Sequence, residues 1–242
     1  MSTLVFDIET VGESWNALDE TTQSTLTRWI ERSAKNEDER TILLKDLKEG
    51  LGFSPLTGMI VAIGLYDLER AQGVVYYQGE EGVGDIDDGA FILKSRSERE
   101  MLEDFWEGAK SYDTFVTFNG RGFDVPFLNL RSAMQSIRPT QDLMQGRYLY
   151  QQKITRHVDL QDQMTFYGAM QRRPSLHLFC RAFGIESPKV DGVAGDDVAE
   201  LFHLKKFRDI AQYNARDVIA TTALYEKWLK YLAPQQFFER FE

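Results

Sequence analysis

Two carboxylates near the start of the chain have a spacing that could support chemistry. Asp7 and Glu9 lie in the segment FDIET at residues 6–10, and the residues around them are mostly apolar. An apolar run of this kind predicts a buried strand, in which side chains two positions apart point to the same face. Two carboxylates on one face repel each other unless a cation neutralises them. The segment therefore predicts a divalent metal site at Asp7 and Glu9.

The acidic composition of the chain provides an alternative explanation for this triplet. Asp and Glu make up 38 of the 242 residues, so an Asp-x-Glu triplet can arise by chance, and Asp67-Leu68-Glu69 is a second copy. The residues that follow this copy, Arg-Ala-Gln-Gly, favour a surface turn between two strands. The triplet alone does not define a site, so its partners must come from elsewhere in the chain.

A third carboxylate, Asp124, ends the segment FNGRGFD at residues 118–124. The apolar residues before it predict a short strand, the glycines predict a tight turn, and the aspartate opens the next helix. Asp124 should therefore lie near the C-terminal end of a strand. Capping of the helix is the alternative role for its side chain.

The third informative segment is YNARD at residues 213–217, inside an apolar helical pattern near the C-terminus. The spacing of four residues stacks Tyr213 and Asp217 on one helix face, beside the side chains that should pack on the sheet. The alternatives are a structural salt bridge from Asp217 to Arg216 or Arg208, and a half-buried core position for the Tyr213 ring.

The remaining pattern predicts an α/β fold whose sheet is built by the first half of the chain. Two helices are expected between residues 14 and 50, and a capping box at Ser97 opens another helix that runs to about residue 110. Strands at 59–66 and 73–78 should pair with the first strand as an antiparallel set of three. Further strands are expected at 114–118 and 157–160, and a long helix at about 209–232.

Composition limits the class of protein. A hydrophobic content of 43% can bury a full core, and we expect one domain over residues 1–242. No apolar stretch is long enough to span a bilayer and the start lacks a signal-peptide pattern, which leads us to expect a cytoplasmic protein with no membrane partner. The single cysteine, Cys180, excludes an internal disulfide and a cysteine zinc cluster, and its apolar neighbours indicate a buried, inert thiol.

Charge is unevenly distributed along the chain. The net charge of -10 argues against binding of nucleic acid through bulk positive charge, but residues 121–189 carry ten basic and five acidic side chains. Four aromatic residues are interleaved with these cations: Tyr148, Tyr150, Phe166 and Tyr167. Such a mixture suits a single nucleic-acid strand, with its phosphates on the cations and its bases on the rings. Ordinary surface charges and core aromatics are the alternative.

Together, FDIET, FNGRGFD and YNARD occur in the order of the three motifs of the DEDD superfamily of 3'-5' exonucleases, and the chain resembles this superfamily. Its third motif resembles the tyrosine subgroup (DEDDy), because Gln212 stands where the histidine subgroup has histidine. The chain is most similar to the proofreading domain of family-B DNA polymerases and to stand-alone predicted exonucleases related to it. Residues 56–64 and 191–202 extend the resemblance, and it is weakest in a helical insertion at about 13–54.

The resemblance implies an RNase H-like fold, with a mixed sheet flanked by helices, and phosphodiester hydrolysis assisted by two Mg²⁺ or Mn²⁺ ions. The residues expected to hold the ions are Asp7, Glu9, Asp124 and Asp217, with Asp7 between the two ions. Tyr213 is expected to orient the attacking water. The backbone at Thr10 should meet the terminal 3'-OH, and Asn119 and Phe123 should touch the last nucleotides. A single-stranded 3' end, with DNA favoured over RNA, is the expected substrate.

Two other functions are compatible with the same residues. An exoribonuclease of the superfamily would use the same carboxylates, and a module that binds nucleic acid or protein would retain the fold without catalysis. The presence of all four carboxylates argues against the second. For the acidic insertion at 13–54, we expect a lid, a surface for a protein partner, or most simply a cover for an edge of the sheet.

Overall fold

The computed structural model describes residues 2–79, 84–189 and 197–238. Its sheet is formed by β1 (Thr3–Gly12), β2 (Gly58–Asp67), β3 (Gln72–Tyr77), β4 (Ile86–Asp88), β5 (Phe91–Ser95), β6 (Thr114–Thr117) and β7 (Arg156–Asp159). The helices are α1 (Glu20–Ser33), α2 (Glu37–Glu49), α3 (Glu98–Ala109), α4 (Asp124–Met134), α5 (Leu160–Met164), α6 (Leu176–Phe183), α7 (Val198–His203) and α8 (Phe207–Tyr231). Short 3-10 turns lie at Trp15–Ala17, Gly50–Phe53, Leu149–Gln151 and Gln235–Phe237.

The seven strands form one mixed sheet in the order β4-β5-β3-β2-β1-β6-β7. β1 pairs antiparallel with β2, and β2 pairs antiparallel with β3, which confirms the predicted set of three. On its other side β1 runs parallel to β6, and β6 runs parallel to β7. The predicted mixed α/β fold is thus confirmed, and β1 lies inside the sheet with a strand on each side.

Strands β4 and β5 are not predicted from the sequence. β4 has three residues and β5 has five, and β5 pairs parallel with β3 while β4 folds back on β5. A parallel pairing is fixed by tertiary contact, and strands this short carry too few residues for a clear alternating pattern. The sheet is therefore wider on this side than the sequence pattern indicates.

The second Asp-x-Glu copy occupies the predicted turn between β2 and β3. The carboxylate of Asp67 accepts hydrogen bonds from the Tyr112 hydroxyl (2.9 Å) and from the Arg70 backbone N–H (2.8 Å). The carboxylate of Glu69 accepts one from the Thr3 backbone N–H (2.9 Å). These partners fix the turn, so this copy has a structural role, as predicted.

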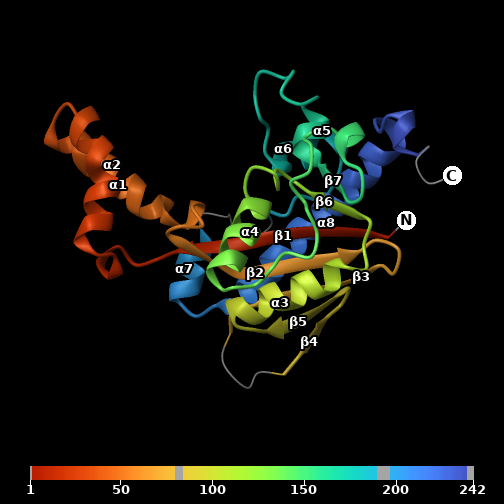
Figure 1. The fold of residues 1–242 in the computed structure, drawn as a ribbon, viewed down its shortest axis with the longest axis horizontal. Helices are drawn as coiled ribbons and strands as arrows, with labels where there is room; N and C mark the ends of the chain where they lie inside the picture. The colour runs from red at the N-terminus through yellow and green to blue at the C-terminus, as the bar shows by residue number, and fades with distance from the viewer. Residues whose placement is uncertain (1, 80–83, 190–196, 239–242) are drawn as a thin grey trace.

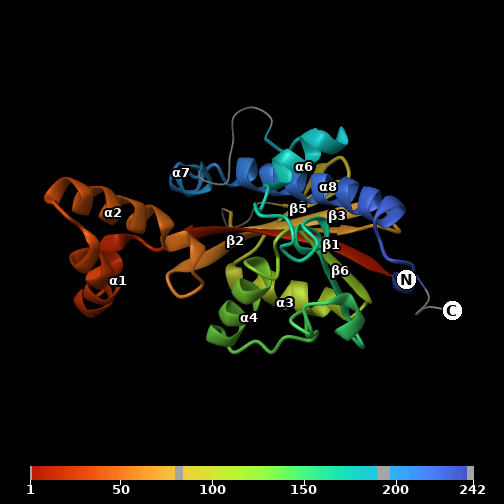
Figure 2. The same ribbon diagram turned by 90° about the horizontal axis from the view of Figure 1, so that it is seen from above.

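Helices cover both faces of the sheet (Figure 2), with α6, α7 and α8 on one face and α3 and α4 on the other. Because side chains alternate along β1, this strand contributes to the hydrophobic core on both faces of the sheet. Val5 and Val11 belong to the core under α8, whereas Leu4, Phe6 and Ile8 belong to the core under α3 and α4. By the same alternation Asp7 and Glu9 face the α8 layer. The two carboxylates therefore interrupt the apolar core that lies under α8.

Helices α1 and α2 form a hairpin that stands away from the rest of the molecule beyond one end of the sheet (Figure 1). Asp19 and Asn36 cap the two helices by accepting hydrogen bonds from Thr22 and Glu39 backbone N–H groups. The expected edge cover is wrong, because the edge strands are β4 and β7 and the hairpin lies at neither. The hairpin leaves Trp29 47% exposed. A lid or a partner surface stays a prediction for it.

In the described part of the chain, no helix has the length and apolar character required to cross a membrane.

Candidate active site

Three carboxylates from two distant segments meet on the α8 face of the sheet. β1 presents Asp7 and Glu9, and α8 crosses this face and supplies Asp217 from its middle. One carboxylate oxygen from each of the three lies within 4.8 Å of the others. The strand alternation and the helical position of Asp217 thus produce one acidic cluster from residues about 210 positions apart in the sequence.

Asp124 lies next to this cluster and is tied to β1. It is the first residue of α4, is 2% exposed, and accepts a hydrogen bond of 3.1 Å from the backbone N–H of Ile8. Ile8 stands between Asp7 and Glu9, so this bond attaches α4 to the strand that carries the pair. The N-cap residue of α4 is Phe123, so helix capping does not account for the placement of the Asp124 side chain. Its oxygens do not belong to the three-residue group above.

The turn before Asp124 is held by a residue that the sequence did not single out, Asp159 at the end of β7. Its carboxylate accepts hydrogen bonds of 3.0 Å from the backbone N–H groups of both Asn119 and Arg121. Asn119 is in the left-handed region with φ 64°, and a Cβ on Gly120 would stand 2.3 Å from Thr117 Oγ1. Asp159 and these backbone constraints therefore set the direction in which the chain enters α4.

Burial disfavours the charged forms of all four carboxylates, and repulsion from neighbouring carboxylates adds to this at Asp7, Glu9 and Asp124. Burial, followed by the charges of Asp124, Glu9 and Asp217, raises the pKa of Asp7 well above its ordinary value. Burial and the Asp217 charge do the same to the pKa of Glu9. Burial also raises the pKa of Asp124 to about 7 and that of Asp217 to about 6. A cluster of this kind is stabilised by cations.

Tyr213 is a buried hydrogen-bond donor to this cluster. Its hydroxyl donates to the carboxylate of Asp217, and burial together with the neighbouring carboxylates raises the pKa of the phenol far above its ordinary value. The phenol therefore stays protonated at neutral pH, which suits a positioning role and not a general base. The alternative of a half-buried core ring is therefore wrong, because the Tyr213 ring is only 5% exposed and its hydroxyl faces the carboxylates.

The salt-bridge alternative for Asp217 is wrong for the described residues. None of the ion pairs found among residues 2–79, 84–189 and 197–238 includes Asp217. Arg208 pairs with Asp88 at 3.4 Å, and the guanidinium of Arg216 lies over the Tyr213 ring at 5.9 Å and donates to the Pro188 carbonyl. The charges of Arg216 and Lys189 act on Asp217 from a distance and lower its pKa.

Asn214 is a site residue that sequence reasoning missed. Its side-chain N–H donates a hydrogen bond of 2.8 Å to Asp7 Oδ2, and the residue is 0% exposed. Its Oδ1 packs against Gly64, which pairs with Asp7 across β1 and β2; a Cβ at Gly64 would stand 2.2 Å from that oxygen. Two signals were present in the sequence: an amide inside YNARD and a glycine inside an apolar strand.

The donor set fits divalent metal ions. Asp7, Glu9 and Asp217 offer only carboxylate oxygens, the ligands that hard cations such as Mg²⁺ and Mn²⁺ prefer. No lysine or arginine forms an ion pair with them among the described residues, so a bound cation would supply the missing positive charge. These residues form a group that could hold a metal, with Asp124 beside it.

The three residues predicted to touch nucleic acid are Thr10, which follows Glu9, and Asn119 and Phe123 in the segment that ends at Asp124. The Thr10 hydroxyl donates to the Gly52 carbonyl at 2.7 Å, so its side chain ties β1 to the turn after α2. Phe123 packs edge-on against Phe53, with ring centroids 6.5 Å apart. Asn119 is half-buried in the turn that leads to Asp124. Their contacts with a substrate stay predictions. Of residues 191–202, those at 191–196 lie outside the described residues.

Comparison with solved structures relates this fold to a DNA polymerase. The family B DNA polymerase from the hyperthermophilic archaeon Pyrobaculum calidifontis matches with a TM-score of 0.58 and 18% identity. The match covers 94% of this chain and 24% of the polymerase chain, so the protein is similar to about a quarter of that polymerase. This likeness establishes the fold, which is that of the polymerase exonuclease domain, the RNase H-like type.

Comparison with curated proteins gives no match. A family model described as "Predicted 3'-5' exonuclease related to the exonuclease domain of PolB" matches residues 73–238. The matched range contains Asp124, Tyr213 and Asp217; Asp7 and Glu9 lie before it and join them through the fold. Because the match covers more than half of the chain, the protein belongs to this family of predicted 3'-5' exonucleases related to the exonuclease domain of PolB.

Proposed function

We propose that the protein is a metal-dependent 3'-5' exonuclease that removes nucleotides from the 3' end of single-stranded DNA. The observation that carries the proposal is the meeting of Asp7, Glu9 and Asp217 within 4.8 Å beside the buried Asp124. Hydrolysis of a phosphodiester by two metal ions needs such an oxygen-rich site. The family of the chain supports the same reaction.

Asp7, Glu9, Asp124 and Asp217 would hold two Mg²⁺ or Mn²⁺ ions. When bound, the ions would lower the pKa of the attacking water and stabilise the charge that develops on the phosphate and on the leaving 3'-oxygen. To take this role, the Asp124 side chain must contact an ion while it also accepts the hydrogen bond from the Ile8 N–H. The Ile8 N–H bonds to Oδ1, so in this proposal Oδ2 is the oxygen that would contact an ion.

The remaining residues position these groups. Asn214 fixes the orientation of the Asp7 carboxylate through its 2.8 Å hydrogen bond, and Tyr213 fixes that of Asp217. The oxygen of the protonated phenol can also accept a hydrogen bond from the attacking water and so orient it. In this proposal Asn119 and Phe123 contact the last nucleotides, and the backbone at Thr10 meets the terminal 3'-OH.

Single-stranded DNA and RNA of equal sequence distinguish the proposal from the ribonuclease alternative, because only RNA carries the 2'-OH. Each labelled strand is incubated with the protein and Mg²⁺, Mn²⁺ or EDTA. We expect DNA to be shortened with either metal, no reaction in EDTA, and no reaction with Asp7→Ala. Faster shortening of RNA than of DNA would support the exoribonuclease alternative. Degradation of neither strand would contradict an enzyme and support a module that only binds.

A further inference from the structure

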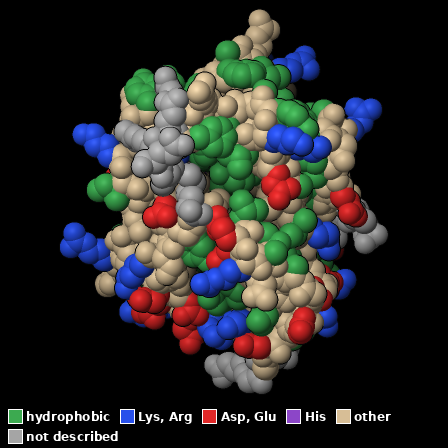
Figure 3. Space-filling model, turned by 90° about the vertical axis from the view of Figure 1, so that its right-hand side faces the viewer, with side chains coloured by type: hydrophobic (Ala, Val, Ile, Leu, Met, Phe, Trp, Pro, Cys, Tyr) green, Lys and Arg blue, Asp and Glu red, His purple; other side chains and the backbone are tan. Residues whose placement is uncertain are grey.

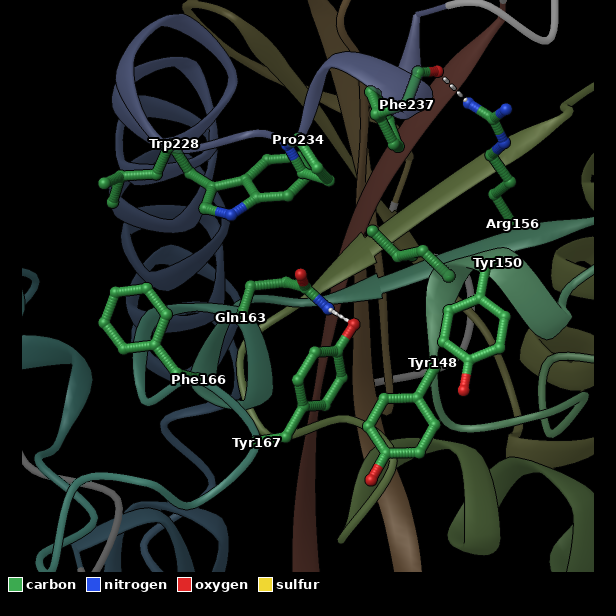
Figure 4. Close-up of a pocket in the computed structure, with 11 residues that line it drawn as sticks. Tyr148, Tyr150, Arg156, Gln163, Phe166, Tyr167, Trp228, Pro234 and Phe237 are labelled. Atoms are coloured by element: carbon green, nitrogen blue, oxygen red, sulfur yellow. Dashed lines mark hydrogen bonds between the residues drawn. The ribbon is translucent and has the colours of Figure 1, made fainter.

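A cavity of about 670 Å³ lies on the α8 side of the sheet, away from the carboxylates. Four segments form its walls: the 3-10 turn at Leu149–Gln151 with its flanks, the start of β7, the end of α5 with the turn after it, and the C-terminal end of α8 with the following residues. Figure 4 shows their side chains arranged around one opening. Hydrophobic side chains are gathered on the corresponding side of the molecule (Figure 3).

The walls of this cavity are unusually rich in aromatic rings. Three of the four aromatics that the sequence interleaves with cations contact one another here: Tyr148 and Tyr150 are stacked with planes 11° apart, and Tyr167 packs against Tyr148 with centroids 4.6 Å apart. Phe166 and Tyr150 are 60% and 70% exposed. Flat rings that are open to solvent offer surfaces on which nucleobases stack, whatever their sequence.

The backbone holds these rings outward at an energetic cost. Phe166, Tyr167 and Gly168 are three successive residues in the left-handed region, with φ of 53°, 57° and 90°. Only the glycine adopts this region without strain, so the two aromatic residues raise the free energy of the folded state. Burial of Phe166 does not offset the cost, because its side chain is mostly exposed. Strained, exposed aromatic residues of this kind are typical of binding sites.

The charge of the walls complements an anionic chain. Residues 147–156, 163–167 and 227–237 contain five basic and no acidic residues. Arg147 is paired with Asp162 at 2.6 Å and Arg156 is buried, so Lys153, Lys227 and Lys230 are the exposed cations of these segments that phosphates would contact. Arg156 is 6% exposed at the wall, where its guanidinium lies 4.7 Å from the Phe237 ring centroid. Lys227 and Lys230 are exposed on α8 on either side of Trp228. Phosphates of a strand whose bases stack on the rings would meet these cations.

The cavity lies within reach of the strand that would occupy the carboxylate site. Asp217 and Trp228 are on the same helix, 11 residues apart, which at about 1.5 Å per residue places them roughly 16 Å apart along α8. At about 3.4 Å per stacked nucleotide, this distance spans roughly five nucleotides. A strand with its 3' end at the carboxylates can therefore reach the cavity.

We propose that this cavity binds nucleobases of the single-stranded substrate about five nucleotides upstream of the 3' end, through stacking on Tyr148, Tyr150, Phe166 and Tyr167. The inference rests on the exonuclease function proposed above. It adds a second binding site, so substrates long enough to reach both sites should be held more tightly than short ones.

The test compares a trinucleotide of deoxythymidine with a 12-nucleotide strand. The double variant Tyr150→Ala/Phe166→Ala removes two exposed rings without opening the core. We expect its affinity for the 12-nucleotide strand, measured by fluorescence anisotropy in EDTA, to fall about tenfold or more. The advantage in kcat/KM of the long over the short substrate, measured with Mg²⁺, should shrink by a similar factor. Ile92→Ala, which removes a 45% exposed apolar side chain on β5, is the control and should retain both values.

A second variant separates binding from a structural role. Phe166→Gly relieves the left-handed strain, so we expect a raised Tm together with weakened binding of the 12-nucleotide strand. Unchanged affinity and an unchanged length advantage in both variants would overturn the inference while leaving the exonuclease intact. A wild-type protein that binds the long strand through these rings but cleaves neither substrate would support the cavity and contradict the proposed function.

Discussion

The side-chain amide of Asn214 on α8 donates a 2.8 Å hydrogen bond to the carboxylate of Asp7 on β1, and Gly64 on β2 gives it the space to do so. This contact joins the first and last segments of the site across 207 residues. It also fixes which Asn214 atom faces the carboxylate, because an amide oxygen there would repel Asp7.

Replacement of Asn214 by Asp should test this contact with almost no change in size. The new carboxylate cannot donate to Asp7 and adds negative charge, so we expect activity and Mn²⁺ affinity to fall roughly 10- to 100-fold. Isothermal titration measures the affinity without catalysis. Gln212→Ala, on the same helix but directed to Asp88, is the control and should bind Mn²⁺ as the wild type does. Wild-type Mn²⁺ affinity in the Asn214→Asp protein would show that Asn214 does not position Asp7.

Replacement of Gly64 by Ala should push α8 away from β2. The added methyl group would stand 2.2 Å from Asn214 Oδ1 and 2.9 Å from a Val218 methyl group, both in a packed core. We expect about 1–3 kcal/mol of destabilisation in urea unfolding, together with reduced activity. Gly108→Ala in α3 is the matched control, because nothing lies within 4 Å of its added Cβ. A Gly64→Ala protein as stable and active as the wild type would contradict the close approach.

Replacement of Tyr213 by Phe removes one hydroxyl from a buried ring. Asp217 loses its hydrogen-bond donor, and the attacking water loses its orienting group, so turnover should fall roughly 10- to 100-fold. Affinity for single-stranded DNA should stay nearly unchanged, because the ring still fills its place in the core. Single-turnover rates and anisotropy measure the two quantities separately. A rate equal to that of the wild type would refute the positioning role.

Stability of the metal-free protein should rise as the pH falls from about 7 to about 4. Burial raises the pKa of Asp124 to about 7 and of Asp217 to about 6 in the folded state, whereas their unfolded values are near 3.8. In this window the clustered carboxylates bind more protons in the folded state than in the unfolded state, so through them acid stabilises the folded state by roughly a few kcal/mol. The buried His157, whose pKa is lowered to about 4, opposes part of this gain. Urea unfolding in EDTA at several pH values measures the slope.

The variant Asp124→Asn isolates the contribution of one carboxylate to that slope. It should be more stable than the wild type at pH 7.5 and lose this advantage by pH 4, because the amide imitates the protonated acid. Saturating Mg²⁺ should flatten the wild-type dependence, since bound cations favour the charged carboxylates. A pH dependence that is identical in the wild type and in Asp124→Asn would contradict the raised pKa of Asp124.

Local patterns in the sequence predicted most of the elements that carry the site. The alternation around Asp7 and Glu9 depends only on neighbouring residues, and so does the i, i+4 spacing of Tyr213 and Asp217. Each pattern lies within a single element, and the structure contains the predicted strand as β1 and the predicted helix as α8. The turn at Asp67 was predicted for the same reason.

Features that depend on contact between distant segments could not be predicted in this way. The fit of Asn214 against Gly64, and the hold of Asp159 on the turn before Asp124, join residues separated by 38 positions or more. β5 is defined by its parallel pairing with β3. The α1–α2 hairpin was wrongly expected at a sheet edge, because its local sequence does not determine its direction relative to the sheet. Tyr150 and Phe166 were noted as aromatics among cations, but only the fold places them around one cavity.

The central claim is most directly tested by the products of a 12-nucleotide single strand labelled at its 5' end. With Mg²⁺ and the wild-type protein, the account predicts a ladder that shortens one nucleotide at a time from the 3' end, and no ladder with Asp217→Asn. Persistence of the full-length strand with wild-type protein, or an equal ladder with Asp217→Asn, would contradict it.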